Sequence, residues 1–208
     1  MTRFAPLEQD AARGRRPDGT RRDWPAIVVC LGLAALAIGF PQPVLATEQT
    51  GRSDRMLAIG VIAHDRGPAS DHHENGVDLN LEIQFGPLDF PGAPRPHLGI
   101  TANFSGDTSV AYAGLGFRLH ESSRWFADAL LGVAVHDGPL HKDPTGCRLY
   151  SDCGFGTRFL PRFGAEAGYR LSPAASISLF YDHMSHKWIV SGENEGLDHI
   201  GVRYLRQY

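Results

Sequence analysis

The sequence predicts an all-β protein, an eight-stranded antiparallel transmembrane β-barrel. Three observations lead to this fold class. Beyond Thr47 apolar residues recur at every second position, eight such segments follow one another, and Pro and Gly mark the connections between them. The chain also contains 24 glycines in 208 residues, which is typical of strands and turns rather than of long helices. Eight is the smallest common strand number for a single-chain membrane barrel.

The segment from Val77 to Phe85 shows the two-residue period most clearly. Apolar side chains occupy its odd positions and polar side chains its even positions. A membrane barrel turns the apolar face to lipid and the polar face to a wet lumen. A lipocalin-like soluble barrel would bury the apolar face instead, and alternation alone leaves that architecture open.

The other strands follow from the same pattern in chain order. In the fifth segment Leu130 interrupts the alternation, and in the sixth Arg162 and Glu166 oppose an apolar face. Such charges are costly in lipid, but they can pair with one another in a lumen. The eight expected strands are 57–63, 77–85, 98–104, 111–119, 125–135, 158–170, 175–185 and 196–208.

The first 46 residues predict a cleaved signal peptide. Five arginines between Arg13 and Arg22 precede the uncharged apolar run from Ala26 to Phe40, which is short for a membrane span. Val44-Leu45-Ala46 then provides the small-x-small pattern of a cleavage site. An uncleaved N-terminal anchor is the alternative. Residues 47–208 are expected to form one domain, the outer-membrane β-barrel, because they are too few for two cores.

Two cysteines remain after cleavage. Cys147 and Cys153 lie close together in a stretch that contains Gly, Pro and Asp, and export permits a disulfide between them. A two-cysteine metal site is the alternative. His72 and His73 lie between Asp71 and Glu74, where an exposed polar loop or a metal site would explain them.

The topology and the charge constrain location and partners. If both ends of the barrel lie in the periplasm, the connections at 65–76, 105–108, 137–154 and 186–195 face out of the cell. The terminal Tyr208 resembles the assembly signal of outer-membrane barrels. A net charge of −3 argues against a nucleic-acid partner. The sequence leaves a homodimer open.

A chemical site is indicated near the end of the chain. His183 and Ser185 are two positions apart, so their side chains emerge on one face of a strand, the face that also carries Leu179 and Tyr181. That face is the expected lipid side. His and Ser in isolation are also common polar residues at a barrel rim.

The stretch from Arg162 to Ser185, followed by Asn194 to Asp198, resembles the last hairpin of the lipid A 3-O-deacylase (PagL-like) family, whose hallmark is His-x-Ser followed by Asn-x-Gly-x-Glu/Asp. The resemblance implies an esterase that hydrolyses the ester-linked 3-hydroxyacyl chain of lipid A in the outer membrane, with no metal or cofactor. It implies Ser185 as nucleophile, His183 as general base, Asp198 as the acid of the triad and Asn194 at the oxyanion site.

The sequence departs from the family pattern at two points. His186 stands where the family has Asn, and the loop before Asn194 is one residue longer, so Glu193 and Glu195 are rival acids. Strand geometry favours Asp198, because Glu195 lies an odd number of residues away and would point into the lumen. A bulge near Gly196 would reverse that choice.

A non-enzymatic barrel is the alternative function, with an adhesive or membrane-stabilising role. His183, Ser185 and Asp198 would then be structural residues only. Co-occurrence of the three on one side of adjacent strands is the feature that separates the two functions, since a structural role does not need it.

The signal-peptide interpretation predicts that the mature protein starts at about Thr47. Edman sequencing or intact mass of the protein purified from outer membranes measures the start. A mature chain that begins before residue 30 would contradict the interpretation.

Overall fold

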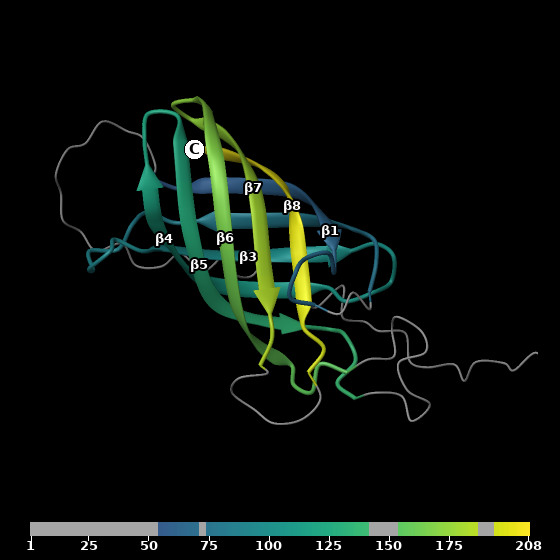
Figure 1. Cartoon of the computed structure of the whole chain (residues 1–208). Helices are drawn as coiled ribbons and strands as arrows, with labels where there is room; N and C mark the ends of the chain where they lie inside the picture. The colour runs from purple at the N-terminus through teal and green to yellow at the C-terminus, as the bar shows by residue number, and fades with distance from the viewer. Residues whose placement is uncertain (1–53, 71–73, 142–153, 187–193) are drawn as a thin grey trace, which may run out of the picture.

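The computed structural model describes residues 54–70, 74–141, 154–186 and 194–208. Its strands form one closed antiparallel barrel in which each strand pairs with its neighbours in the sequence, as Figure 1 shows for β7 and β8. The predicted fold class is confirmed. The strands are β1 Met56–His64, β2 Val77–Gln84, β3 Arg95–Asn103, β4 Val110–Glu121, β5 Trp125–His136, β6 Phe159–Ser172, β7 Ala175–Met184 and β8 Leu197–Gln207.

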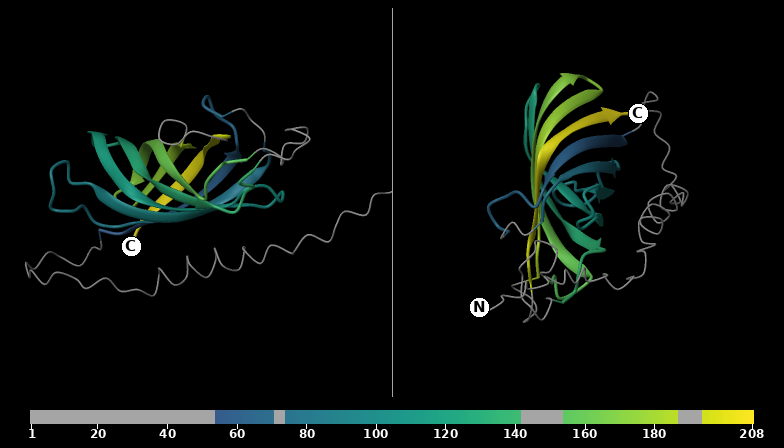
Figure 2. Two further views of the ribbon diagram at one scale, coloured as in Figure 1. Left: turned by 90° about the horizontal axis from the view of Figure 1, so that it is seen from below. Right: turned by 90° about the vertical axis from the view of Figure 1, so that its right-hand side faces the viewer.

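The barrel closes between its first and last strands. β8 pairs with β1 over nine positions, from His64 opposite His199 to Met56 opposite Gln207. Figure 2 shows yellow β8 beside dark blue β1 at this closure. Because β1 and β8 pair with each other as well as with β2 and β7, the sheet has no free edge. A closed ladder satisfies the backbone donors and acceptors that lipid cannot satisfy.

The outer surface is apolar along the strands. Val61 is 60% exposed, Leu179 57% and Val202 50%. The residues that precede and follow each of them in its strand are buried or half-buried. This is the lipid-facing band of a membrane barrel. Trp125 and Tyr169 lie edge to face with ring centroids 4.9 Å apart, near the barrel end that carries the C-terminus. Aromatic pairs of this kind are typical of a membrane interface.

The lumen is charged, and its charges pair. Arg203 is fully buried and donates to Glu166 at 2.5 and 2.9 Å and to Glu82 at 3.0 Å. Arg162, also fully buried, donates to Asp182 at 2.6 Å. A buried guanidinium without a carboxylate partner would be strongly destabilising, so these pairs maintain one arrangement of the barrel interior.

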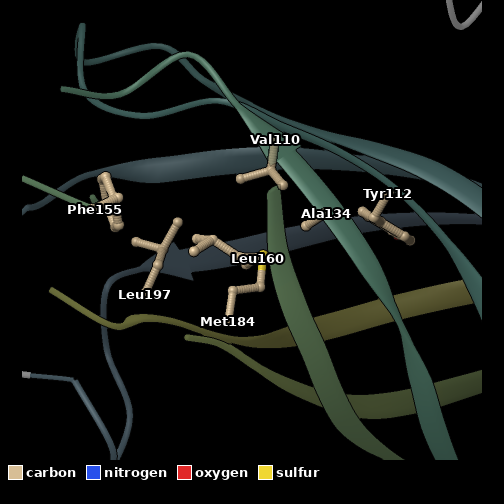
Figure 3. Packing of buried hydrophobic residues seen from close by; sticks show 7 residues of the cluster. All are labelled: Val110, Tyr112, Ala134, Phe155, Leu160, Met184 and Leu197. Atoms are coloured by element: carbon tan, nitrogen blue, oxygen red, sulfur yellow. The ribbon is translucent and has the colours of Figure 1, made fainter. Parts of the chain in front are cut away.

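An apolar cluster is buried at one end of the barrel, and Figure 3 shows its side chains. We call this the distal end, where the β1–β2, β3–β4, β5–β6 and β7–β8 connections lie. The cluster consists of Val110, Tyr112, Ala134, Phe155, Leu160, Met184 and Leu197. A second inward cluster joins Leu130 to Ile62 and Phe180, which explains why Leu130 interrupts the alternation of β5.

Several sequence predictions lie outside the described residues. They are the signal peptide of residues 1–46, the disulfide between Cys147 and Cys153, and the loop site at His72 and His73. Among the residues that the structure describes, none forms a helix long and apolar enough to cross a membrane.

Arg203→Leu is expected to lower the free energy of unfolding by about 3–5 kcal/mol, because it leaves Glu82 and Glu166 as buried carboxylates without their cation. A urea titration of the refolded barrel in detergent micelles measures the change. Arg206→Leu is the control, since Arg206 is exposed on the same strand. Equal stability of the two variants would contradict the role assigned to the buried pair.

Candidate active site

His183 and Asp198 form a close pair across two adjacent strands. They are register partners in the β7–β8 ladder, and Nδ1 of His183 lies 2.6 Å from Oδ1 of Asp198. Both project to the outside of the barrel, on the same faces as Leu179 and Val202. The His183 side chain is 22% exposed, whereas the Asp198 side chain is fully buried.

The first part of the β1–β2 connection, which we call the distal segment and which includes Ala69 and Ser70, covers Asp198 on the outside of the barrel. The backbone N–H groups of Ala69 and Ser70 donate to its Oδ2 at 2.7 and 3.0 Å. The Tyr181 hydroxyl donates to Oδ1 at 3.2 Å. Together with His183, these groups give both carboxylate oxygens hydrogen-bond partners. The charge of Asp198 is therefore buried without being left unsatisfied.

Two glycines permit this close packing. A Cβ at Gly67 would lie 2.4 Å from Oδ2 of Asp198, and a Cβ at Gly196 would lie 2.8 Å from Cε1 of His183. Real Cβ atoms do not approach other heavy atoms so closely. Any side chain at either position would therefore displace one member of the pair.

Ser185 follows the end of β7 on the same outward face as His183. Asn194, across the β7–β8 connection, donates from Nδ2 to Ser185 Oγ at 2.9 Å. Its Oδ1 accepts the backbone N–H of His186 at 2.8 Å. One amide therefore links the start of the connection to its end and places an N–H donor beside the serine oxygen.

His186 is the residue that stands where the family pattern has an asparagine. Its side chain is buried, and Nε2 lies 2.7 Å from the carbonyl oxygen of Phe155. The ring therefore attaches the end of β7 to the segment that precedes β6. The backbone N–H of His186, rather than its side chain, contacts Asn194.

The structure brings together four of the residues singled out by sequence in two contacts, His183 with Asp198 and Ser185 with Asn194. No register shift occurs in the β7–β8 ladder between Arg206 and Leu197, so the expected facing of Asp198 is retained. Glu195 is buried and its backbone N–H donates to Gly154 O at 3.2 Å. Glu193 lies outside the described residues.

Sequence reasoning missed the N–H donors of Ala69 and Ser70. They lie 129 and 128 positions from Asp198, and a backbone donor carries no residue-type signal. Gly67 before Pro68 was the one local sign of a turn there. Tyr181 was recognised as sharing the face of His183, but its hydrogen bond to Asp198 was not predicted.

The arrangement has the chemical parts of an acyl-transfer site. Asp198 engages Nδ1 of His183, which leaves Nε2 as the nitrogen able to accept a proton. Ser185 supplies a hydroxyl on the same face, and Asn194 supplies an N–H donor next to it. Nucleophile, base, orienting acid and oxyanion donor are the four groups that serine esterases require.

Comparisons with known proteins bear on the family and the fold. The family model "Lipid A 3-O-deacylase (PagL)" matches residues 91–206, which is more than half of the chain and includes all four site residues. The crystal structure of the outer membrane enzyme PagL is 15% identical, with a TM-score of 0.53, over 73% of this chain and 98% of that chain. That likeness supports the fold.

Two other solved barrels match with lower TM-scores. A de novo designed transmembrane β-barrel is 18% identical, with a TM-score of 0.45, over 76% of this chain and 99% of the design. The outer membrane protein Ail of Yersinia pestis is 13% identical, with a TM-score of 0.42, over 74% of this chain and 99% of Ail. No curated protein sequence matches the chain.

Asp198→Asn is expected to lower the rate of ester hydrolysis by about 10⁴-fold, because an amide neither fixes the productive tautomer of His183 nor stabilises its imidazolium. Glu195→Gln is the matched control and should have a mild effect. Turnover of a long-chain ester in detergent micelles, with folding checked by heat-modifiable gel mobility, measures both. The reverse ranking would identify Glu195 as the acid.

Proposed function

We propose that this chain, which belongs to the lipid A 3-O-deacylase (PagL) family, is a serine esterase that removes the 3-O-linked hydroxyacyl chain from lipid A. The protein is located in the bacterial outer membrane, as its family and its barrel fold require. The observation that carries the proposal is the 2.6 Å contact between His183 and Asp198 on the lipid-facing wall, beside Ser185.

In the proposed reaction Ser185 Oγ attacks the carbonyl carbon of the 3-O-ester while Nε2 of His183 takes the serine proton. The tetrahedral intermediate collapses, the bond between the carbonyl carbon and the ester oxygen breaks, and His183 returns the proton to that oxygen, which leaves as the 3-hydroxyl of the sugar. Water, deprotonated by the same histidine, then cleaves the acyl-enzyme and releases a 3-hydroxy fatty acid. Asp198 orients His183 and stabilises the imidazolium in both half-reactions.

Asn194 is the proposed oxyanion donor. Its Nδ2 already lies 2.9 Å from Ser185 Oγ. In the tetrahedral intermediate the oxyanion is bonded to the same carbon as that Oγ atom. Its Oδ1 is engaged by the His186 N–H, which fixes the orientation of the amide. A donor held in place before reaction has little reorganisation to undergo in the transition state.

The position of the site suits a substrate that is itself a membrane lipid. The outward faces of β7 and β8 below the site carry Ile177, Leu179 and Val202, which are 43%, 57% and 50% exposed. Acyl chains can pack along these side chains while the sugar and its ester remain at the distal rim. No aqueous lumen is needed for access, because the site opens to the lipid.

The buried carboxylate also bears on the non-enzymatic alternative. A barrel with only an adhesive or stabilising role gains little from a buried Asp198 beneath the distal segment, since a buried ion pair seldom stabilises more than a well-packed apolar group. The contact of Asp198 with Nδ1 of His183 instead orients a histidine that shares its outward face with Ser185. The esterase proposal therefore explains the arrangement better.

Ser185→Ala is expected to abolish deacylation while leaving the barrel folded, because the side chain lies at the rim and supplies chemistry rather than packing. Mass spectrometry of lipid A from cells that express the protein should show the species lacking one 3-hydroxyacyl chain. Cells with Ser185→Ala should lack that species. Ser176→Ala, on the same strand and far from the site, is the control and should retain it. Full activity of Ser185→Ala would remove the serine mechanism.

A further inference from the structure

The inward faces of the strands that carry the candidate active site hold a second group of residues. His64 at the end of β1, Asp78 at the start of β2 and His199 in β8 bring their ligand atoms within 4.8 Å of one another. All three side chains are at least 99% buried. His199 adjoins Asp198 in the chain, so this group lies behind the outward-facing pair, across the barrel wall.

Each histidine of the group faces a further carboxylate with its second nitrogen. His64 directs Nδ1 to Asp78 at 2.7 Å and Nε2 to Glu74 at 2.8 Å. His199 directs Nε2 toward Asp78 at 3.5 Å and Nδ1 toward Asp182 at 3.1 Å. A carboxylate on the far nitrogen of each imidazole is the arrangement that orients histidine ligands of metal ions.

The hydrogen bonding of His199 is incomplete. Among the residues that the structure describes, neither of its ring nitrogens has a hydrogen-bond partner of acceptable geometry, although the ring is 1% exposed. Oδ1 of Asp182, 3.1 Å from Nδ1 of His199, is likewise outside hydrogen-bonding geometry. Buried polar atoms of this kind are costly unless another group satisfies them. Both nitrogens of His199 face carboxylates, which is where a cation would be most stable.

The charges around the group also favour a divalent cation. Glu74, Asp78 and Asp182 supply three negative charges, and Arg162, 2.6 Å from Asp182, supplies one positive charge. These three carboxylates and the one guanidinium therefore carry a net charge of about −2, histidines not counted. One divalent cation would neutralise this charge.

We propose that His64 Nδ1, Asp78 and His199 Nε2 bind one divalent transition-metal ion of the Zn²⁺ type in the barrel lumen. Two imidazoles and one carboxylate favour Zn²⁺, Co²⁺ or Ni²⁺ over Mg²⁺ and Ca²⁺, which prefer all-oxygen sites. Glu74 and Asp182 then accept the N–H groups on the far side of the two rings. The ion connects β1, β2 and β8 at the distal end.

Small movements would complete the site. Tetrahedral Zn²⁺ with bonds of about 2.0–2.1 Å separates its ligand atoms by roughly 3.3 Å. The contact of His199 with Asp78 is already 3.5 Å, and that of His64 with Asp78 opens from 2.7 Å. The proton that His64 shares with Asp78 leaves when the metal binds.

Two protons are the rival explanation for the same cluster. If both histidines were imidazolium ions, they would neutralise the net charge without a metal. That arrangement predicts no stoichiometric metal binding, whereas the metal site predicts one Zn²⁺ per barrel. Metal content therefore separates the two explanations without any measurement of activity.

The test refolds the full mature barrel in detergent and titrates it with Zn²⁺ by calorimetry in the presence of excess Mg²⁺ and Ca²⁺. Stoichiometric binding is expected. His199→Gln should weaken Zn²⁺ binding by at least about 100-fold and Glu74→Gln by about 10–100-fold. His136→Gln, which removes a buried lumen histidine outside the group, is the matched control and should leave the affinity unchanged. Ser185→Ala should bind Zn²⁺ normally, so failure of the esterase proposal would not affect this result.

X-ray absorption of the Zn²⁺-loaded unmodified protein provides a measurement that does not depend on the folding of variants. Scattering from two imidazole rings is expected in the metal shell. Absence of stoichiometric binding, absence of imidazole scattering, or undiminished binding by a folded His199→Gln barrel would each overturn the proposal.

Discussion

Closure of the β1–β8 ladder is the constraint on which the other features depend. Because every strand has two hydrogen-bonded neighbours, the wall is one residue thick and successive side chains point to opposite media. Asp182 and His183, like His199 and Asp198, are neighbours in the chain with opposite surroundings. A single ladder thus positions an ion-paired interior and the outward-facing pair of His183 and Asp198. The Asp65 carboxylate connects the two sides, because it accepts the backbone N–H of both Glu74 and Asp198.

The fold could be predicted from the sequence because a two-sided wall leaves a period-two pattern in every strand. The predicted and observed strands agree within a few residues. The largest difference is β3, which begins at Arg95, whereas the prediction began at residue 98. Proline at position 96 does not end this strand, since Pro96 still pairs with Leu115. Local composition gave the right elements, and the ladder determined their ends.

The candidate site could be predicted only in part. The alternation of side chains along the strand was enough to place Asp198 on the outer face. The continuous register of the β7–β8 ladder then sets it opposite His183. The same alternation also implied that Asp198 would be exposed, and it is fully buried. Its cover comes from a segment more than a hundred residues earlier in the chain, which local patterns do not encode. Local patterns do not encode the lumen cluster either, since its members His64, Asp78 and His199 lie on three different strands.

The stacking of the lumen arginines on aromatic rings bears on what occupies the barrel interior. The guanidinium of Arg162 lies 3.8 Å from the ring centroid of Tyr112, and that of Arg203 lies 4.2 Å from that of Phe180. These guanidinium groups, stacked on rings and paired with carboxylates, connect side chains of different strands across the lumen. Within the described residues these cations share the barrel interior with the apolar cluster of the distal end, so paired charges and apolar side chains occupy it together.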